Sequence, residues 1–120
     1  MQLIKNEEVT RPDLAYLDFM YRMNFIFTKK GTIRFISHLD LMRLFARAFR
    51  RGGLPVKMTE GFSPHPKFSI KRALKLGVES DNEEAVLVLR DYVGEEEFKE
   101  KLQQQLPVGI EIKSVKAIVG

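Results

Sequence analysis

The segment that follows Ser37 carries the signals of an amphipathic helix with both ends marked. Ser37 and Asp40 match a capping box, in which the Ser37 hydroxyl accepts a hydrogen bond from the Asp40 backbone amide. At about 100° per residue, the apolar side chains gather on one side of the helix and the charged ones on the other. Gly52 and Gly53 supply a C-terminal cap. The pattern predicts a helix over residues 38–51 that exposes Arg43, Arg47, Arg50 and Arg51 to solvent.

Extended segments lie on both sides of this helix. Strand patterns occur at residues 22–36 with a turn at 29–31, and at 56–59, 67–70, 84–90 and 110–115. The continuous apolar run at 84–90 predicts a central strand. A second helix is expected over 95–106, because acidic residues begin it and Pro107 ends it. The order β-α-β-β-α-β predicts an α+β fold of the ferredoxin-like type, an antiparallel sheet with two helices on one face.

Charge is distributed unevenly along the chain. Residues 22–75 contain 13 lysines and arginines against only Asp40 and Glu60, a balance of +11, whereas residues 76–120 contain 5 basic and 10 acidic residues, a balance of −5. Such segregation favours a surface that faces a polyanion such as RNA. The alternative is that folding disperses the charges over every face of the domain.

The rest of the composition excludes several classes of protein. The 120 residues include no cysteine, which excludes disulfides, thiolate metal sites, cysteine nucleophiles and iron–sulfur ligation. Apolar runs are too short to cross a membrane and no signal peptide pattern occurs, so a cytoplasmic protein without membrane contact is expected. The length fits one domain at residues 22–118, after an extension or linker at 1–21 with a helical pattern near 14–20.

Residues 61–67, Gly-Phe-Ser-Pro-His-Pro-Lys, form the most distinctive loop. Pro64 and Pro66 fix φ on both sides of His65 and restrict the residue before each proline to extended conformations. The imidazole is therefore displayed with little conformational entropy to lose when a partner binds. The alternative is a stiff surface turn in which His65 packs locally.

Basic residues of the loop and of the first helix are candidate contacts for RNA phosphates or for a protein partner. Phe62 or Phe68, if exposed, could stack on an unpaired base. The aromatic motif of RNA-recognition sheets is absent, and Phe25, Phe27 and Phe35 are expected in the core. The candidate binding residues are Arg34, Arg43, Arg47, Arg50, Arg51, Lys57, Phe62, His65, Lys67, Lys71 and Arg72.

The two histidines are weaker candidates for chemistry. His38 falls on the apolar side of the first helix, in its first turn, from which it could approach His65. The pair could then cleave RNA by acid–base catalysis, or hold a divalent metal ion together with Asp40 and Glu60. Two histidines and two carboxylates at irregular spacing are a weak signal, so no catalytic residue, metal or cofactor is assigned.

Three segments, RFISHLDLMR at 34–43, RRGGLP at 50–55 and GFSPHPK at 61–67, resemble the radical-SAM-linked domain family of bacteria. Members of that family are uncharacterised and are encoded beside, or fused to, radical SAM proteins, which implies an accessory role with a radical SAM partner. A radical SAM enzyme holds its cluster through cysteines, so this chain cannot be that catalyst.

We therefore expect a non-catalytic accessory domain that binds RNA electrostatically and works with a radical SAM enzyme. One alternative is a protein–protein docking module for the same enzyme. A second alternative is a histidine-dependent RNA nuclease or a metal-binding enzyme.

Overall fold

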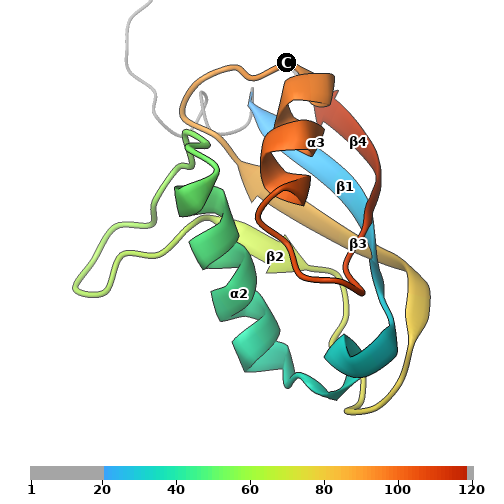
Figure 1. Ribbon diagram of the computed structural model, residues 1–120. Coiled ribbons are helices and arrows are strands. Elements are labelled where there is room, and N and C mark those ends of the chain that lie inside the picture. The colour runs from blue at the N-terminus through green and yellow to red at the C-terminus, as the bar shows by residue number, and fades with distance from the viewer. Residues whose placement is uncertain (1–20, 119–120) are drawn as a thin grey trace, which may run out of the picture.

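The strands and helices follow the predicted order. A computed structural model of the chain describes residues 21–118 (Figure 1). Its elements are β1 (Arg22–Lys29), the 3-10 helix η1 (Gly31–Phe35), α2 (His38–Arg51), β2 (Phe68–Ile70), β3 (Ser80–Val88), α3 (Glu95–Gln103) and β4 (Ile112–Ile118). Residues 1–20 of the predicted extension, with their helical pattern near 14–20, lie outside the described residues.

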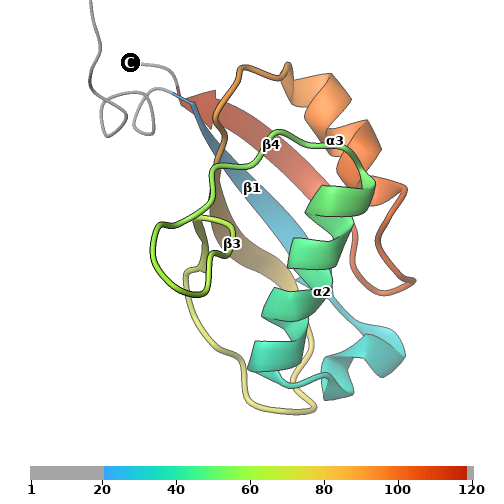
Figure 2. The same ribbon diagram turned by 90° about the vertical axis from the view of Figure 1, so that its left-hand side faces the viewer.

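The four strands form one antiparallel sheet in the order β2-β3-β1-β4. The apolar run at 84–90 contributes to β3, which lies beside β1 in the centre as predicted. Both helices cover the same face of the sheet, and no described helix covers the other face (Figure 2). The predicted ferredoxin-like α+β arrangement is confirmed, and we call the uncovered side the open face.

The first helix has the predicted bounds and caps. Ser37 Oγ accepts from the Asp40 backbone amide at 3.1 Å, as the capping box requires. Gly53 takes a positive φ of 69° after the last turn, a conformation that glycine adopts at little cost. The helix buries Leu41, Phe45, Ala48 and Phe49, so its apolar side faces the sheet. Its four arginines lie on the exposed side.

The core between α2 and the sheet is built mainly from phenylalanine rings. Phe45 is fully buried, and its ring centre lies 4.9–5.9 Å from those of four other rings: Phe25, Phe27, Phe49 and Phe68. These separations are typical of favourable tilted and edge-to-face pairs. α3 adds Phe98 and Leu102 to the same core cluster.

One predicted strand takes a different form. Residues 32–36 belong to η1 and its cap, because Gly31 turns the chain with a φ of 66° and the Ile36 amide then donates to Ile33 O at 3.0 Å. The buried Lys29 ammonium donates to Ile36 O at 3.1 Å and secures this turn. The expectation that Phe35 lies in the core was wrong, since its ring is 56% exposed.

No helix among residues 21–118 is both long and apolar enough to span a membrane.

Removal of the central ring should destabilise the domain far more than removal of an exposed one. Phe45→Ala opens a cavity among four rings, and we expect it to lower the free energy of unfolding by about 3–5 kcal/mol. Phe62→Ala, at a fully exposed position, should change it by less than about 0.5 kcal/mol. Urea denaturation followed by circular dichroism measures both. Equal losses would contradict the assignment of Phe45 as the centre of the core.

Candidate functional site

The predicted loop at 61–67 forms the end of a narrow two-stranded ribbon. The Thr59 amide donates to His65 O at 2.7 Å, and the His65 amide donates to Thr59 Oγ1 at 3.1 Å. Residues 56–59, predicted as a strand, form only the isolated bridges Val56–Leu89 and Met58–Pro66. The ribbon extends away from the sheet, with residues 60–64 at its tip (Figure 1).

The tip of the ribbon displays an aromatic side chain. Phe62 has a relative exposure of 108%, the highest among the large apolar side chains that are exposed in the described residues. Gly61 precedes it with a φ of 119°, which a residue with a side chain rarely adopts. His65 is exposed, and its Nδ1 lies 3.2 Å from Pro66 O. The loop thus combines an outward Phe62 with a His65 that makes a local contact.

The ribbon lies against the C-terminal half of α2. A shallow hollow of about 210 Å³ separates them and is lined by Ala46, Arg50, Leu54, Val56, Met58 and Pro66. The ribbon and the exposed arginines of α2 therefore border one another.

The exposed arginines of α2 differ in their partners. Arg43 forms an ion pair with Asp40, one turn earlier, at 3.4 Å. Arg47, Arg50 and Arg51 are exposed and have no carboxylate partner among the described residues. Arg50 and Arg51 lie in the last turn, where a positive charge also stabilises the helix dipole. Arg47 lies outside that turn, so the helix dipole does not account for it.

Several other predicted binding residues are already paired with acidic residues. Arg34 lies 3.9 Å from Glu79 with its guanidinium 4.4 Å from the centre of the Phe35 ring, and Lys71 lies 3.5 Å from Glu84. Lys30 and Asp81 are 2.8 Å apart, and their hydrogen bond raises the pKa of Lys30 and lowers that of Asp81. Folding therefore neutralises part of the basic half with carboxylates of residues 79–84.

Arg72 has the most specific of these pairings. Its Nε and Nη2 donate to Glu83 Oε2 at 3.1 and 2.7 Å, and the Ser80 hydroxyl donates to the same oxygen at 2.6 Å. Glu83 is only 2% exposed, and its hydrogen bonds raise the pKa of Arg72. Burial lowers the pKa of nearby Lys29, and the charge of Glu83 opposes that shift. Arg72 thus compensates a buried carboxylate.

The remaining predicted contacts lie in the ribbon and in the core. Lys57 and Lys67 are half-buried, and the Lys67 amide donates to Lys57 O at 2.8 Å. Phe68, the alternative stacking residue, packs against Phe25 and Phe49 under α2, so its ring is not displayed for a base. Of the two candidate stacking residues, only Phe62 is exposed.

The histidines and carboxylates that were considered for chemistry do not form a metal-binding cluster. Within residues 21–118 no three His, Cys, Asp or Glu side chains are grouped so that they could hold a metal ion. His38 begins α2, whereas the ribbon that carries His65 packs against Ala46 and Arg50. These contacts lie about 12–18 Å along the helix from His38 at its rise per residue. The predicted approach of His38 to His65, with Asp40 and Glu60, therefore lacks support from the fold.

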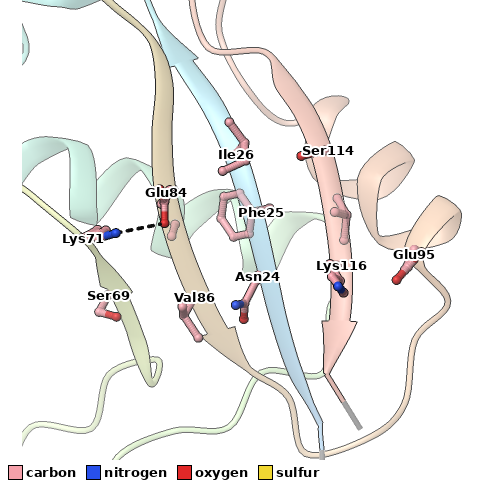
Figure 3. A pocket seen from close by; sticks show the side chains of 12 residues that line it. Asn24, Phe25, Ile26, Ser69, Lys71, Glu84, Val86, Glu95, Ser114 and Lys116 are labelled. Carbon is pink, nitrogen blue, oxygen red and sulfur yellow. Dashed lines mark hydrogen bonds and ion pairs between the residues drawn. The ribbon is translucent and has the colours of Figure 1, made fainter.

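The open face carries a second candidate site, which sequence reasoning missed. A hollow of about 800 Å³ there is lined by residues of all four strands and by Glu95 (Figure 3). Asn24 lies at its centre, with Val86 and Lys116 as its register partners on the two neighbouring strands. The available signal in the sequence was the polar Asn24 between Met23 and Phe25, because every second residue of a strand faces the same side.

Comparison with known proteins places the chain in a family. Residues 22–120 match the family model described as "Uncharacterized protein conserved in bacteria (DUF2344)". The chain belongs to this family. No curated protein and no solved structure matches it. The family confirms the expectation of an uncharacterised bacterial domain, and the association with radical SAM proteins stays a prediction.

The adjacent residues Glu83 and Glu84 of β3 should differ sharply in their contribution to the free energy of unfolding. Glu83→Gln weakens charge-assisted hydrogen bonds in a buried site and removes the negative charge that opposes the lowered pKa of Lys29, so we expect a loss of about 1.5–3 kcal/mol. Glu84→Gln removes only an exposed pair and should cost less than about 0.5 kcal/mol. Urea denaturation measures both values. Similar losses would show that the Glu83 cluster is not structural.

Proposed function

We propose that this domain is a non-catalytic accessory domain that binds RNA through α2 and works with a partner radical SAM enzyme. The observation that carries the RNA-binding part is the group of three exposed arginines, Arg47, Arg50 and Arg51, that have no carboxylate partner in the described part of the chain. The radical SAM partner rests on the resemblance of residues 34–43, 50–55 and 61–67 to the radical-SAM-linked family.

Exposed arginines that lack a carboxylate partner in the described part of the chain suit phosphate recognition. The guanidinium is planar, keeps its charge at all physiological pH values and offers two parallel N–H donors to a phosphate. An arginine without an internal carboxylate loses no ion pair when a phosphate approaches. Arg34, Lys71 and Arg72, which are paired with carboxylates of residues 79–84, would have to give up those contacts first.

The neighbouring ribbon adds a feature that suits unpaired RNA. Phe62 stands fully exposed at its tip, and aromatic rings in such positions stack on bases without regard to their identity. Arg50 lines the hollow that separates α2 from the ribbon. An RNA that places its phosphates on α2 would therefore place an unpaired base on Phe62 within the same continuous surface.

The arginines can be tested through the salt dependence of RNA binding. The double variant Arg47→Ala with Arg50→Ala should lower the slope of log K against log salt by about 1.5, because two phosphate contacts are lost. Fluorescence anisotropy with a labelled RNA pool measures this slope. The matched control, Lys75→Ala with Lys113→Ala, removes two exposed charges elsewhere and should leave the slope near that of the unaltered domain. Equal slopes for the two double variants would contradict the α2 site.

One observation favours a second candidate function, docking of the radical SAM partner through the ribbon. A fully exposed phenylalanine on a proline-stiffened loop is typical of an anchor that enters a pocket of another protein. This function needs no RNA and leaves the α2 arginines to maintain solubility.

Co-purification separates docking from RNA binding. If the ribbon docks the partner, a complex with the radical SAM protein should survive nuclease treatment, and Phe62→Ala should weaken it by roughly 2 kcal/mol or more. Val108→Ala is the matched control, because Val108 is 97% exposed in the loop between α3 and β4. Loss of the complex on nuclease treatment, or equal effects of the two variants, would reject docking through Phe62.

A further inference from the structure

The open face presents side chains in ordered rows that the sheet register defines. One row reads Ser69, Val86, Asn24 and Lys116 across β2, β3, β1 and β4. The next row has Glu84, Ile26 and Ser114 on β3, β1 and β4, and Lys71, just after β2, beside Glu84. All eight residues line the hollow of about 800 Å³ (Figure 3). This volume lies in the range of pockets that hold small ligands.

The centre of the hollow contains an unsatisfied polar group. The Oδ1 atom of Asn24 is buried and has no hydrogen-bond partner among the described residues. A buried acceptor without a donor is unfavourable, so such a group is expected to find a partner in the functional state. Asn24 lines the hollow, and the terminal torsion of asparagine is broad, so a rotation of the carboxamide can bring its oxygen to a ligand there.

The charged residues around Asn24 are two lysines and two glutamates. Lys71 is paired with Glu84 at 3.5 Å, and Glu95 Oε2 accepts from the Ala117 amide at 2.7 Å. Lys116, beside Asn24 in the register, is exposed and has no ion pair with any residue in 21–118. Two lysines and two glutamates balance one another in the lining, and Lys116 is the ammonium group that a phosphate can approach without breaking an ion pair among the described residues.

The floor of the hollow is aliphatic. Val86, in the row of Asn24, and Ile26, in the next row, are half-buried diagonal neighbours on β3 and β1. Their branched side chains form a flat apolar surface on which a planar ring can pack. An amide, an ammonium group and an apolar floor together match the base edge, the phosphate and the base face of one nucleotide.

We propose that the open face binds an unpaired nucleotide of the RNA whose phosphates α2 holds. The base lies over Val86 and Ile26 and exchanges hydrogen bonds with the Asn24 carboxamide, while the phosphate is held by Lys116. This proposal rests on the RNA binding proposed above. The open face and α2 lie on opposite sides of the sheet, so the two contacts are made by different parts of the RNA and can be lost independently (Figure 2).

Nuclear magnetic resonance titration separates the two contacts. A blunt-ended RNA duplex has no unpaired base, so it should shift only amide signals of α2, such as those of Arg47 and Arg50. A short oligouridine, which is unpaired throughout, should shift these and also the amide signals of Asn24, Val86 and Lys116. Oligouridine shifts that are confined to α2 would overturn the proposal and leave the proposed function intact. A duplex and an oligouridine that shift no signal would reject both.

Variants test the roles of the two polar residues. Asn24→Leu keeps a side chain of similar size but no hydrogen-bonding group, and it should weaken oligouridine binding roughly tenfold while duplex binding is unchanged. Lys116→Ala should lower the salt slope for oligouridine by about 0.7, whereas Lys113→Ala, on the same strand outside the hollow, should not change it. Unaltered oligouridine binding by both Asn24→Leu and Lys116→Ala would overturn the proposal.

A titration with uridine monophosphate tests whether the open face binds a nucleotide within an RNA chain or a free nucleotide. If the open face takes a nucleotide of an RNA, the oligouridine should shift the Asn24 and Lys116 signals at a lower concentration than the monophosphate. Shifts with the monophosphate alone would overturn the RNA assignment.

Discussion

The packing of α2 against the sheet through Phe45 is the interaction on which the rest of the structure depends. Its ring meets Phe25 and Phe27 on β1 and Phe68 on β2, so a single helix position joins a central strand to an edge strand. Because the apolar side of α2 is committed to this contact, its arginines must face solvent. Both helices are held on one face, so no helix of residues 21–118 covers the opposite face of the sheet (Figure 2).

Pairing between the two halves of the chain shapes the electrostatics of the domain. The composition suggests a strongly basic first half, yet Lys30, Lys71 and Arg72 reach carboxylates of residues 79–84. This occurs because β3 and the turn before it lie directly beside β1 and β2. The charge left for an external polyanion is concentrated in fewer residues than the count of lysines and arginines implies.

The proposed contacts divide into two surfaces of different character. The outer side of α2 and the ribbon combine the exposed ring of Phe62 with arginines that have no carboxylate partner within residues 21–118, which suits a contact that ignores base identity. The hollow around Asn24 has positive and negative side chains in equal number and offers hydrogen bonds, which suits recognition of a single base. An accessory domain with both would hold an RNA in one orientation relative to a partner enzyme.

The sequence by itself determined the order of the elements, the bounds and caps of α2, the exposure of its arginines and the absence of cysteine chemistry. These follow from local propensity and from helical and strand periodicity, which depend only on neighbours in the chain. Only the tertiary structure decided that residues 32–36 form η1, that Arg72 serves a buried Glu83, that His38 and His65 are not grouped in one metal site, and that Asn24 lies unsatisfied at the centre of a hollow. The last three depend on how residues far apart in sequence are placed by the fold, about which local pattern carries no information. The helix η1 instead forms at the Gly31 turn, where the Lys29 ammonium donates to Ile36 O.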